Sequence, residues 1–416
     1  MNFIWRPFTQ MQKVKEFPEV VRAKDSILYL KNGKKIIDAI SSWWLITHGH
    51  CQKDIVKAIQ ESSQELDQIL FANFTHSKAE QLVKELSEFL PSQLNKFFFS
   101  DNGSTAVESG LKMAVQSRIQ KGEPERNKFL SFKNSYHGDT VGAMSVSARG
   151  IFNRPYKSFL FPIYSCSQGS LSFDSEEKFY RDFERQLEKH HKKLCAVIIE
   201  PLIQGAGGMI IWPVATLKRI CRLAKSRGLY LIFDEVMTGF GRTGSLFAFE
   251  QIGITPDILC LSKGLTGGIL PLALTISTDS IYKNFLSPKK EKALLHGHSF
   301  TGNPLSCSAA LANLKVLKKN KSKLLKKWKQ IESINCDRLK NLKPSVPIKD
   351  KRAKGLVAVV QKKGDYSSDF SYEAYQKALK QGVFIRPLGG VIYILPPYCI
   401  SKQELHKVWD VIESLI

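Results

Sequence analysis

The sequence PDILCLSKGLTGGILP, residues 256–271, places a lysine at the end of an apolar run and just before three glycines. The run Ile258–Leu261 is typical of a buried strand, whereas most lysines lie on exposed surfaces. Glycines after the lysine would let the backbone approach a bound molecule closely. Lys263 is therefore either an ordinary turn residue or part of a binding site. The residues that end the neighbouring strands decide between these two interpretations.

Similar apolar runs alternate with helical patterns through the middle two-thirds of the chain. Continuously apolar strands separated by helices are typical of a mostly parallel sheet that helices cover on both faces. The other clear runs lie at residues 95–100, 128–132, 195–201, 229–235 and 270–277. We therefore expect an α/β fold with a mostly parallel central sheet. From about Lys318 the pattern changes to charged helices and short strands, which indicates a smaller α+β domain.

Composition excludes several classes of protein. The 416 residues are 43% hydrophobic and 24% charged, which is ordinary for a folded globular protein. A net charge of +23 would suit a nucleic-acid partner, but much of it lies on lysine-rich helical stretches such as 315–329. The chain lacks zinc-finger spacing and an RNA-recognition signature, so we expect no nucleic-acid partner.

The cysteines and the hydropathy pattern indicate a cytoplasmic protein. The eight cysteines are scattered without a CxxC pair, as expected of reduced thiols. The sequence shows no signal-peptide core and no apolar run that could span a membrane. Three histidine pairs fit loops or helix surfaces, and no metal is expected; the pairs are His48 and His50, His190 and His191, and His296 and His298.

Polar residues end four of the predicted strands. Ligands of open α/β sheets bind at the carboxyl ends of the strands, where Glu200, Asp234 and Lys263 would meet. The fourth end, residues 100–104, leads into a helix in which Thr105 and Glu108 fit a capping box. A Gly-Ser entry to a helix is a candidate phosphate cradle, although many helices begin this way.

A lysine, an aspartate and a phosphate cradle are the parts that hold pyridoxal 5′-phosphate (PLP). The lysine amine forms a Schiff base with the aldehyde, the aspartate pairs with the protonated ring nitrogen, and the helix end takes the phosphate. A competing motif, residues 239–244, matches GxGxxG after a strand. It lacks a direct turn into a helix and an acidic residue at the expected distance, so we interpret it as a chance match.

Several long motifs resemble class III aminotransferases of PLP fold type I. They are SDNGSTAVE, SYHGDT, LIFDEVMTGFGRTG, PDILCLSKGLTGG and HGHSFTGNPLSCSAAL. Within that family, WRPFTQM, SSWWLITHGH and FIRPLGGVIYILPPY resemble the biotin-pathway members that convert 8-amino-7-oxononanoate to 7,8-diaminononanoate. The resemblance implies a small-molecule transaminase that works as a homodimer with shared active sites. Ornithine and γ-aminobutyrate aminotransferases are the alternative within the family.

The resemblance also implies a domain organisation. Residues 1–45 would form an N-terminal segment that joins the small domain, and residues 46–317 would form the large PLP-binding domain. Residues 318–416 would form the C-terminal small α+β domain.

The resemblance assigns the cofactor site residue by residue. Lys263 would anchor PLP and act as general base and acid, Asp234 would face the ring nitrogen, and Tyr136 would stack on the ring and also touch the substrate. Glu200 would lie near the ring edge. The phosphate would be held by Gly103 and Ser104, with Gly297, His298 and Ser299 completing the site of the partner subunit.

On the substrate side, Trp43 and Trp44 would form an apolar wall and Arg386 would bind the distant carboxylate through its two-pronged guanidinium. Asp139 and Tyr393 are expected beside the substrate, and Phe8 beside the amino donor. S-adenosylmethionine is the expected donor. Lysine is the alternative, because Phe8 replaces a tyrosine that many users of S-adenosylmethionine have, and His298–Ser299 replaces their Pro-Thr pair.

Overall fold

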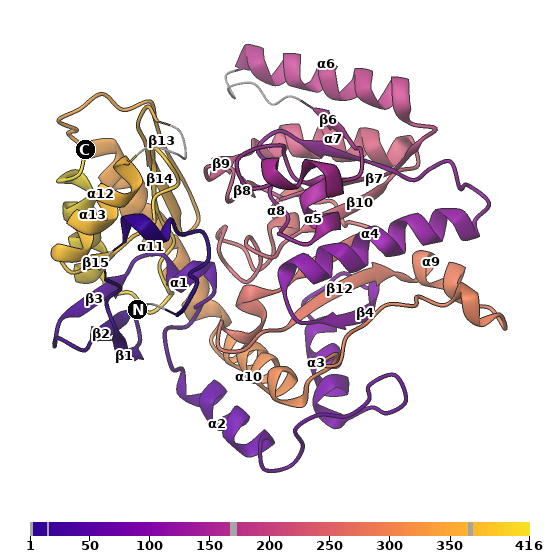
Figure 1. Cartoon of the computed structure of the whole chain (residues 1–416), viewed down its shortest axis with the longest axis horizontal. Coiled ribbons are helices and arrows are strands. Elements are labelled where there is room, and N and C mark those ends of the chain that lie inside the picture. The colour runs from indigo at the N-terminus through magenta and orange to yellow at the C-terminus, as the bar shows by residue number, and fades with distance from the viewer. Residues whose placement is uncertain (1–2, 15, 167–172, 365–368) are drawn as a thin grey trace.

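The computed structural model describes residues 3–14, 16–166, 173–364 and 369–416. A seven-stranded sheet forms its centre and confirms the α/β class (Figure 1). The strands pair in the order β4 (Leu94–Ser100), β12 (Ala273–Thr278), β11 (Ile258–Leu261), β10 (Tyr230–Asp234), β7 (Leu194–Ile199), β5 (Lys128–Phe132) and β6 (Tyr164–Cys166). All six expected strands are present. β11, β10, β7, β5 and β6 pair in parallel, while β12 runs antiparallel to both of its neighbours.

Both faces of this sheet are covered, which explains why its central strands β7, β10 and β11 are almost continuously apolar. In β10, Ile232 packs into the same cluster as Val107 of helix α4 (Gly103–Gln120). Its neighbours Leu231 and Phe233 point to the other face, where they share a cluster with helices α6 (Phe173–His190) and α7 (Val214–Ser226). Successive residues of a strand point to opposite faces, so the two-sided burial follows from the period of two.

Two of the three smaller sheets of the described chain contain strands from its C-terminal part (Figure 1). One of them joins strands from both ends of the chain, since β15 (Val383–Phe384) pairs in parallel with β3 (Lys35–Asp38). β3 also pairs antiparallel with β2 (Ile27–Leu30), which pairs antiparallel with β1 (Val20–Lys24). The other consists of β13 (Asp350–Lys354), β14 (Val357–Gln361) and β16 (Val391–Ile394). The accompanying helices are α10 (Pro304–Lys319), α11 (Lys321–Asn341), α12 (Phe370–Lys380) and α13 (Lys402–Glu413). The domain boundaries at residues 45 and 317 stay a prediction.

The capping box predicted at Thr105 and Glu108 is wrong. Helix α4 begins three residues earlier than that pair requires, because Asn102 has an extended backbone and its side chain accepts a hydrogen bond from the Thr105 backbone N–H. Thr105 returns the bond as the third residue of the helix. Glu108 instead accepts hydrogen bonds from Thr140 Oγ1 and the Ala143 backbone N–H, and so caps helix α5 (Val141–Val146).

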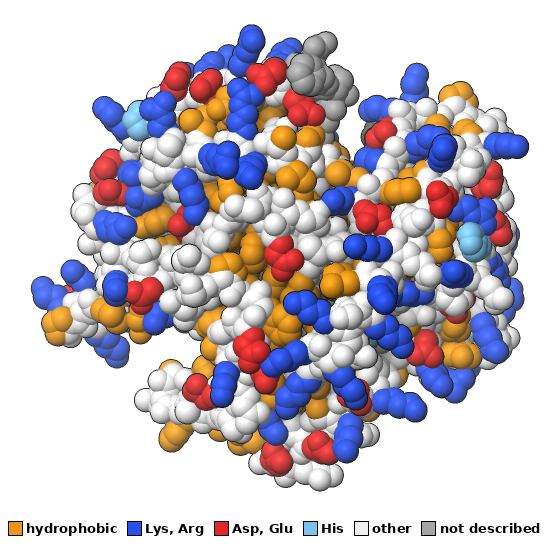
Figure 2. All heavy atoms as spheres, turned by 180° about the vertical axis from the view of Figure 1, so that it is seen from behind, with side chains coloured by type: hydrophobic (Ala, Val, Ile, Leu, Met, Phe, Trp, Pro, Cys, Tyr) orange, Lys and Arg blue, Asp and Glu red, His pale blue; other side chains and the backbone are white. Residues whose placement is uncertain are grey.

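The surface agrees with the dispersed basic charge of the sequence. Figure 2 shows lysine and arginine side chains spread over the visible face and interspersed with acidic ones, without a single basic patch. Among the described residues, no helix combines the length and hydropathy of a membrane span. None of the eight cysteines is paired in a disulfide.

Candidate active site

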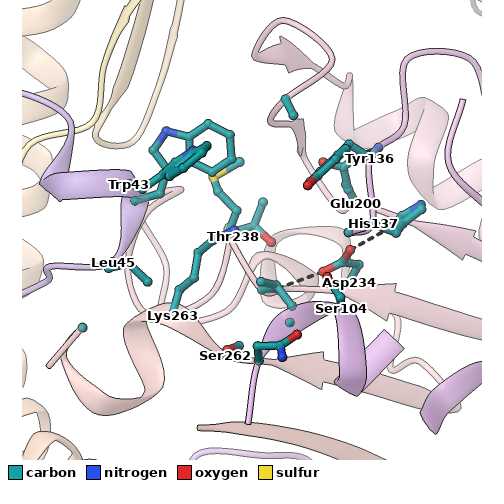
Figure 3. A pocket seen from close by; sticks show the side chains of 18 of the residues that line it. Trp43, Leu45, Ser104, Tyr136, His137, Glu200, Asp234, Thr238, Ser262 and Lys263 are labelled. Atoms are coloured by element: carbon teal, nitrogen blue, oxygen red, sulfur yellow. Dashed lines mark hydrogen bonds and ion pairs between the residues drawn. The ribbon is translucent and has the colours of Figure 1, made fainter. Parts of the chain in front are cut away.

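A cavity of about 520 Å³ lies at the carboxyl ends of β7, β10 and β11. Segments far apart in the sequence line it, and the side chains drawn in Figure 3 converge on it from opposite sides. Ten of the residues expected from the sequence line this cavity: Phe8, Trp43, Trp44, Gly103, Ser104, Tyr136, Glu200, Asp234, Lys263 and Arg386.

Lys263 lies two residues after the end of β11, where the chain turns into a short 3₁₀ helix, Lys263–Thr266. Its backbone has a left-handed φ of 44°, which is uncommon for a residue with a Cβ and is found often at functional sites. Its Nζ atom lies 5.0 Å from the ring of Trp44. Burial lowers the pKa of Lys263 from 10.5 to about 8. Gly268 is required nearby, because a Cβ there would lie 2.6 Å from the backbone of Leu45.

Asp234 ends β10 and points into the cavity. Its Oδ2 atom lies 2.7 Å from Nδ1 of His137, and its Oδ1 atom accepts a hydrogen bond of 3.1 Å from the Val236 backbone N–H. Since an ionised carboxylate only accepts, Nδ1 of His137 carries the proton of this bond. The sequence reasoning missed His137, although it lies inside the SYHGDT motif.

Glu200 follows β7 and is almost completely buried. Its two oxygens accept hydrogen bonds from the backbone N–H groups of Tyr136 (3.0 Å) and Gly205 (2.9 Å). Burial raises the pKa of Glu200 to about 7, with the nearby Asp234 also raising it. Glu200 therefore connects the loop of Tyr136 with the loop of Gly205.

The start of helix α4 forms a narrow cradle. A Cβ on Gly103 would lie 2.5 Å from Cγ1 of Val236, and a Cβ on Gly138 would lie 2.0 Å from Oγ of Ser104. Gly138 has φ of 126°, and the adjacent Asp139 backbone N–H donates to Ser104 Oγ. Helix N-termini attract anions through free N–H groups and the helix dipole. An amine, a carboxylate and an anion cradle on one cavity fit the aldehyde, the ring nitrogen and the phosphate of PLP.

Aromatic side chains and one arginine form the opposite wall. The Phe8 ring contacts Trp43 edge-on at a centroid distance of 5.4 Å, and the Arg386 guanidinium lies 4.7 Å from the Trp43 ring. Arg386 also donates to the Phe8 carbonyl at 3.5 Å. Within the described part of the chain, Arg386 forms no ion pair with a carboxylate. Its charge is therefore available to a carboxylate in the cavity.

The remaining expected residues do not line the cavity. Tyr393 is buried behind the wall, where its hydroxyl accepts a hydrogen bond of 3.0 Å from Nε1 of Trp44. Asp139 is exposed and accepts a bond of 2.9 Å from the Tyr136 hydroxyl. Gly297, His298 and Ser299 lie outside the cavity of their own chain. That they complete the active site of a second copy stays a prediction. Phe152 lines the cavity and was missed, since nothing in its local sequence marks it.

The GxGxxG match does not form a dinucleotide site. Residues 235–247 form a loop between β10 and helix α8 (Ala248–Ile252), so no helix begins at the glycines. Arg242 in this loop is buried, and it donates to the carbonyls of Trp44 (3.2 Å) and Ile46 (2.9 Å). Through Arg242, this motif holds the backbone of the segment that carries Trp44.

Comparisons with known proteins agree with this geometry. The family model described as aminotransferase class-III matches residues 9–416. The chain is 40% identical to the adenosylmethionine-8-amino-7-oxononanoate aminotransferase of Synechococcus elongatus, over 99% of this chain and 98% of that protein. It is 37% identical to the Helicobacter pylori protein of the same name, over 98% and 94%.

Two solved structures are similar over the full length. The crystal structure of the Methanocaldococcus jannaschii adenosylmethionine-8-amino-7-oxononanoate aminotransferase is 34% identical with a TM-score of 0.93, covering 100% of this chain and 96% of that one. A PLP-bound amine transaminase from an uncultivated Pseudomonas species is 26% identical with a TM-score of 0.94, covering 100% and 98%.

Proposed function

Because the chain belongs to the class-III aminotransferase family, we propose that it transfers an amino group to the ketone of 8-amino-7-oxononanoate, with S-adenosylmethionine as the donor. The product would be 7,8-diaminononanoate, an intermediate of biotin biosynthesis. The enzyme is PLP-dependent, as are its structural relatives. The observation that supports the acceptor best is the Arg386 guanidinium over the Trp43 ring, which has no carboxylate partner among the described residues and matches a substrate with an apolar chain and a terminal carboxylate.

The mechanism follows from the positions of the side chains. PLP, when bound, supplies an electrophilic aldehyde and a ring that accepts electron density from the substrate carbon. Lys263 would hold the cofactor covalently between turnovers. Once released, its amine is largely neutral above pH 8, so it could take a proton from the substrate carbon and deliver it to the carbon that was the aldehyde of the cofactor, and the reverse in the other half-reaction. Because Lys263 lies on the cavity wall, one residue can serve both half-reactions.

The other residues bind and orient. Asp234, held by His137, would keep the ring nitrogen protonated, and Tyr136 would cover the ring. Gly103 and Ser104 would take the phosphate at the start of α4. Arg386 would bind the acceptor carboxylate through two parallel hydrogen bonds, which the flat aromatic wall keeps away from bulk water.

A homodimer is part of the proposal. Large apolar side chains lie exposed on one chain, and they would need a cover. They include Leu70, Phe74, Phe159, Leu295 and Phe300. The last two flank Gly297–Ser299, the segment that would complete the site of the partner subunit. We place the enzyme in the cytoplasm, where its cysteines would stay reduced.

The test is a product assay. Purified enzyme is incubated with PLP, 8-amino-7-oxononanoate and S-adenosylmethionine, and 7,8-diaminononanoate is measured by mass spectrometry. Lys263→Ala should form no product, and borohydride should label the parent enzyme only at Lys263. If the enzyme instead transaminates ornithine or γ-aminobutyrate efficiently and forms no diamine from the oxononanoate, it belongs to another branch of the family.

A further inference from the structure

One wall of the cavity is the loop between β8 (Ile203–Gln204) and β9 (Ile210–Ile211). Ala206 of this loop lines the cavity. The loop is tightly constrained, since a Cβ on Gly207 would lie only 1.9 Å from the Asn134 carbonyl oxygen. Met209 has a left-handed φ of 53°. A loop in such a conformation has to be held by contacts from its surroundings.

The β8–β9 loop is held from two sides. On the inner side, Glu200 accepts the hydrogen bond from the Gly205 backbone N–H. On the outer side, Arg352 of β13 donates from Nε to the Met209 carbonyl (2.9 Å) and from Nη2 to the Gly208 carbonyl (2.5 Å). The Arg352 side chain is only 15% exposed. One planar guanidinium therefore binds two successive carbonyls of the loop, a geometry that lysine cannot reproduce.

Arg352 is itself held in one orientation. Its Nη1 atom donates to Oε1 of Gln361 (2.9 Å) on the neighbouring strand and pairs with Asp350 on its own strand. With these bonds the guanidinium has partners on both the sheet and the loop. Strands β13 and β9 lie side by side, so this contact joins the C-terminal sheet to the edge of the cavity (Figure 1).

The same sheet positions the Arg386 end of the cavity. β14 pairs with β13 and with β16, and the segment just before β16 carries Arg386 and Leu388, both of which line the cavity. Leu388 is bridged to Val391 at the start of β16. The β8–β9 loop is connected through Glu200 to the end of β7, two strands from β11 and Lys263. A movement of the sheet relative to the loop would thus change the span between Arg386 and Lys263.

We propose that Arg352 is a positioning residue that sets the span between Arg386 and Lys263 and thereby selects acceptors by chain length. This inference rests on the proposed function for the identity of the acceptor. Arg352 touches neither substrate nor cofactor, and it acts through the β8–β9 loop. A substrate whose carboxylate reaches Arg386 while its ketone reaches Lys263 has to match that span, and small misplacements are costly in catalysis.

The test uses Arg352→Met, which removes the donors at similar length, and Arg352→Lys, which keeps the charge. The matched control is Arg338→Met, because Arg338 on α11 also bonds a carbonyl and a carboxylate, His406 and Asp410, away from the cavity. Dissociation constants of nonanoate, heptanoate and pentanoate are measured on the PLP-loaded enzymes. Hydrogen exchange of residues 203–211 is followed in the proteins without cofactor.

We expect the parent and Arg338→Met to prefer nonanoate. Arg352→Met should lose that preference by roughly tenfold, with faster exchange of residues 203–211 and an unchanged visible spectrum of bound PLP. Arg352→Lys should recover part of the preference, and it carries the test if the Met variant does not fold. An unchanged length preference with faster exchange would overturn the proposal, because Arg352 would then only stabilise the loop. Loss of the PLP spectrum would overturn it as well.

These outcomes are separate from those of the product assay. If the parent enzyme does not aminate the oxononanoate, the proposed acceptor fails, yet the carboxylate series and the exchange data still report on the span. If the parent does aminate it and Arg352→Met keeps the length preference, only the role of Arg352 fails.

Discussion

The Nδ1 atom of His137 lies 2.7 Å from Oδ2 of Asp234, and both side chains are buried at the floor of the cavity. A buried carboxylate is stable as an anion only when donors surround it. His137 provides one donor, and the Val236 backbone N–H provides another. His137 therefore orients the carboxylate of Asp234, the group that we propose faces the ring nitrogen.

Replacing His137 by alanine should lower kcat while PLP remains bound. The loss of one hydrogen bond to a charged group is worth about 1.5 to 3 kcal/mol, or roughly 10-fold to 100-fold. The visible spectrum checks binding of PLP, and steady-state kinetics check kcat. His406→Ala, at an exposed position, is the control. A normal kcat in His137→Ala would show that Asp234 needs no such partner.

The Lys263 amine should react as a base at a lower pH than other lysines. Burial lowers the pKa of Lys263 to about 8, so in the protein without cofactor half of its amines are neutral near that pH. Limited acetylation at a series of pH values, read by mass spectrometry, gives the midpoint for each lysine. Lys57, which is exposed, serves as the internal reference. A midpoint of Lys263 near 10.5 would contradict the effect of burial.

Glu235 should make stability depend on pH. Burial raises the pKa of Glu235 from 4.5 to about 8, while its oxygens accept bonds from the Ala248 and Phe249 backbone N–H groups. Between these pH values the folded state binds more protons than the unfolded state. The contribution of Glu235 is therefore fully present below pH 4.5 and is lost as pH rises through 8.

Glu235→Gln removes this titration. The melting temperature of the parent should fall relative to that of Glu235→Gln as pH rises from 4.5 to 8, as measured by thermal unfolding without cofactor. Glu61→Gln, at an exposed position, should leave the pH dependence of the parent unchanged. Parallel melting curves for the parent and Glu235→Gln would exclude a raised pKa.

The sequence predicted the sheet well because the signal is local. Each expected strand is a short apolar run, and the rule that ligands bind at carboxyl strand ends brought Glu200, Asp234 and Lys263 together. The antiparallel direction of β12 was not predictable, because apolar runs carry no information on strand direction. The capping box at α4 was misplaced by a few residues, which is the usual precision of element boundaries.

The substrate wall depends on contacts between distant parts of the chain. Trp44 bonds to Tyr393, and Arg386 bonds to the Phe8 carbonyl, although hundreds of residues separate the partners. No local pattern could predict these pairs, so the expected neighbours of the substrate came from the family resemblance. The same reason explains why Phe152 and the Arg352 contact were not anticipated.

Arg386→Ala should raise KM for the oxononanoate strongly and leave the donor half-reaction nearly unchanged. A bidentate, charge-assisted contact is worth on the order of 1.5 to 3 kcal/mol, or roughly 10-fold to 100-fold in KM. The methyl ester of the acceptor is the control substrate, because it lacks the charge. If Arg386→Ala still prefers the acid over the ester as strongly as the parent does, another residue binds the carboxylate.

The donor should be identified by the first half-reaction alone. Phe8 lines the cavity and contacts Trp43 and Phe152 edge-on, so it offers an aromatic surface to an adenine ring but no hydroxyl. We expect S-adenosylmethionine to bleach the visible band of the enzyme, as measured in a stopped-flow spectrophotometer without acceptor. Phe8→Tyr introduces the hydroxyl and should accelerate this reaction severalfold. The reaction of the enzyme with the product diamine serves as the control and should not change. Bleaching by lysine but not by S-adenosylmethionine would replace the donor and leave the acceptor, the fold and the role of Lys263 unaffected.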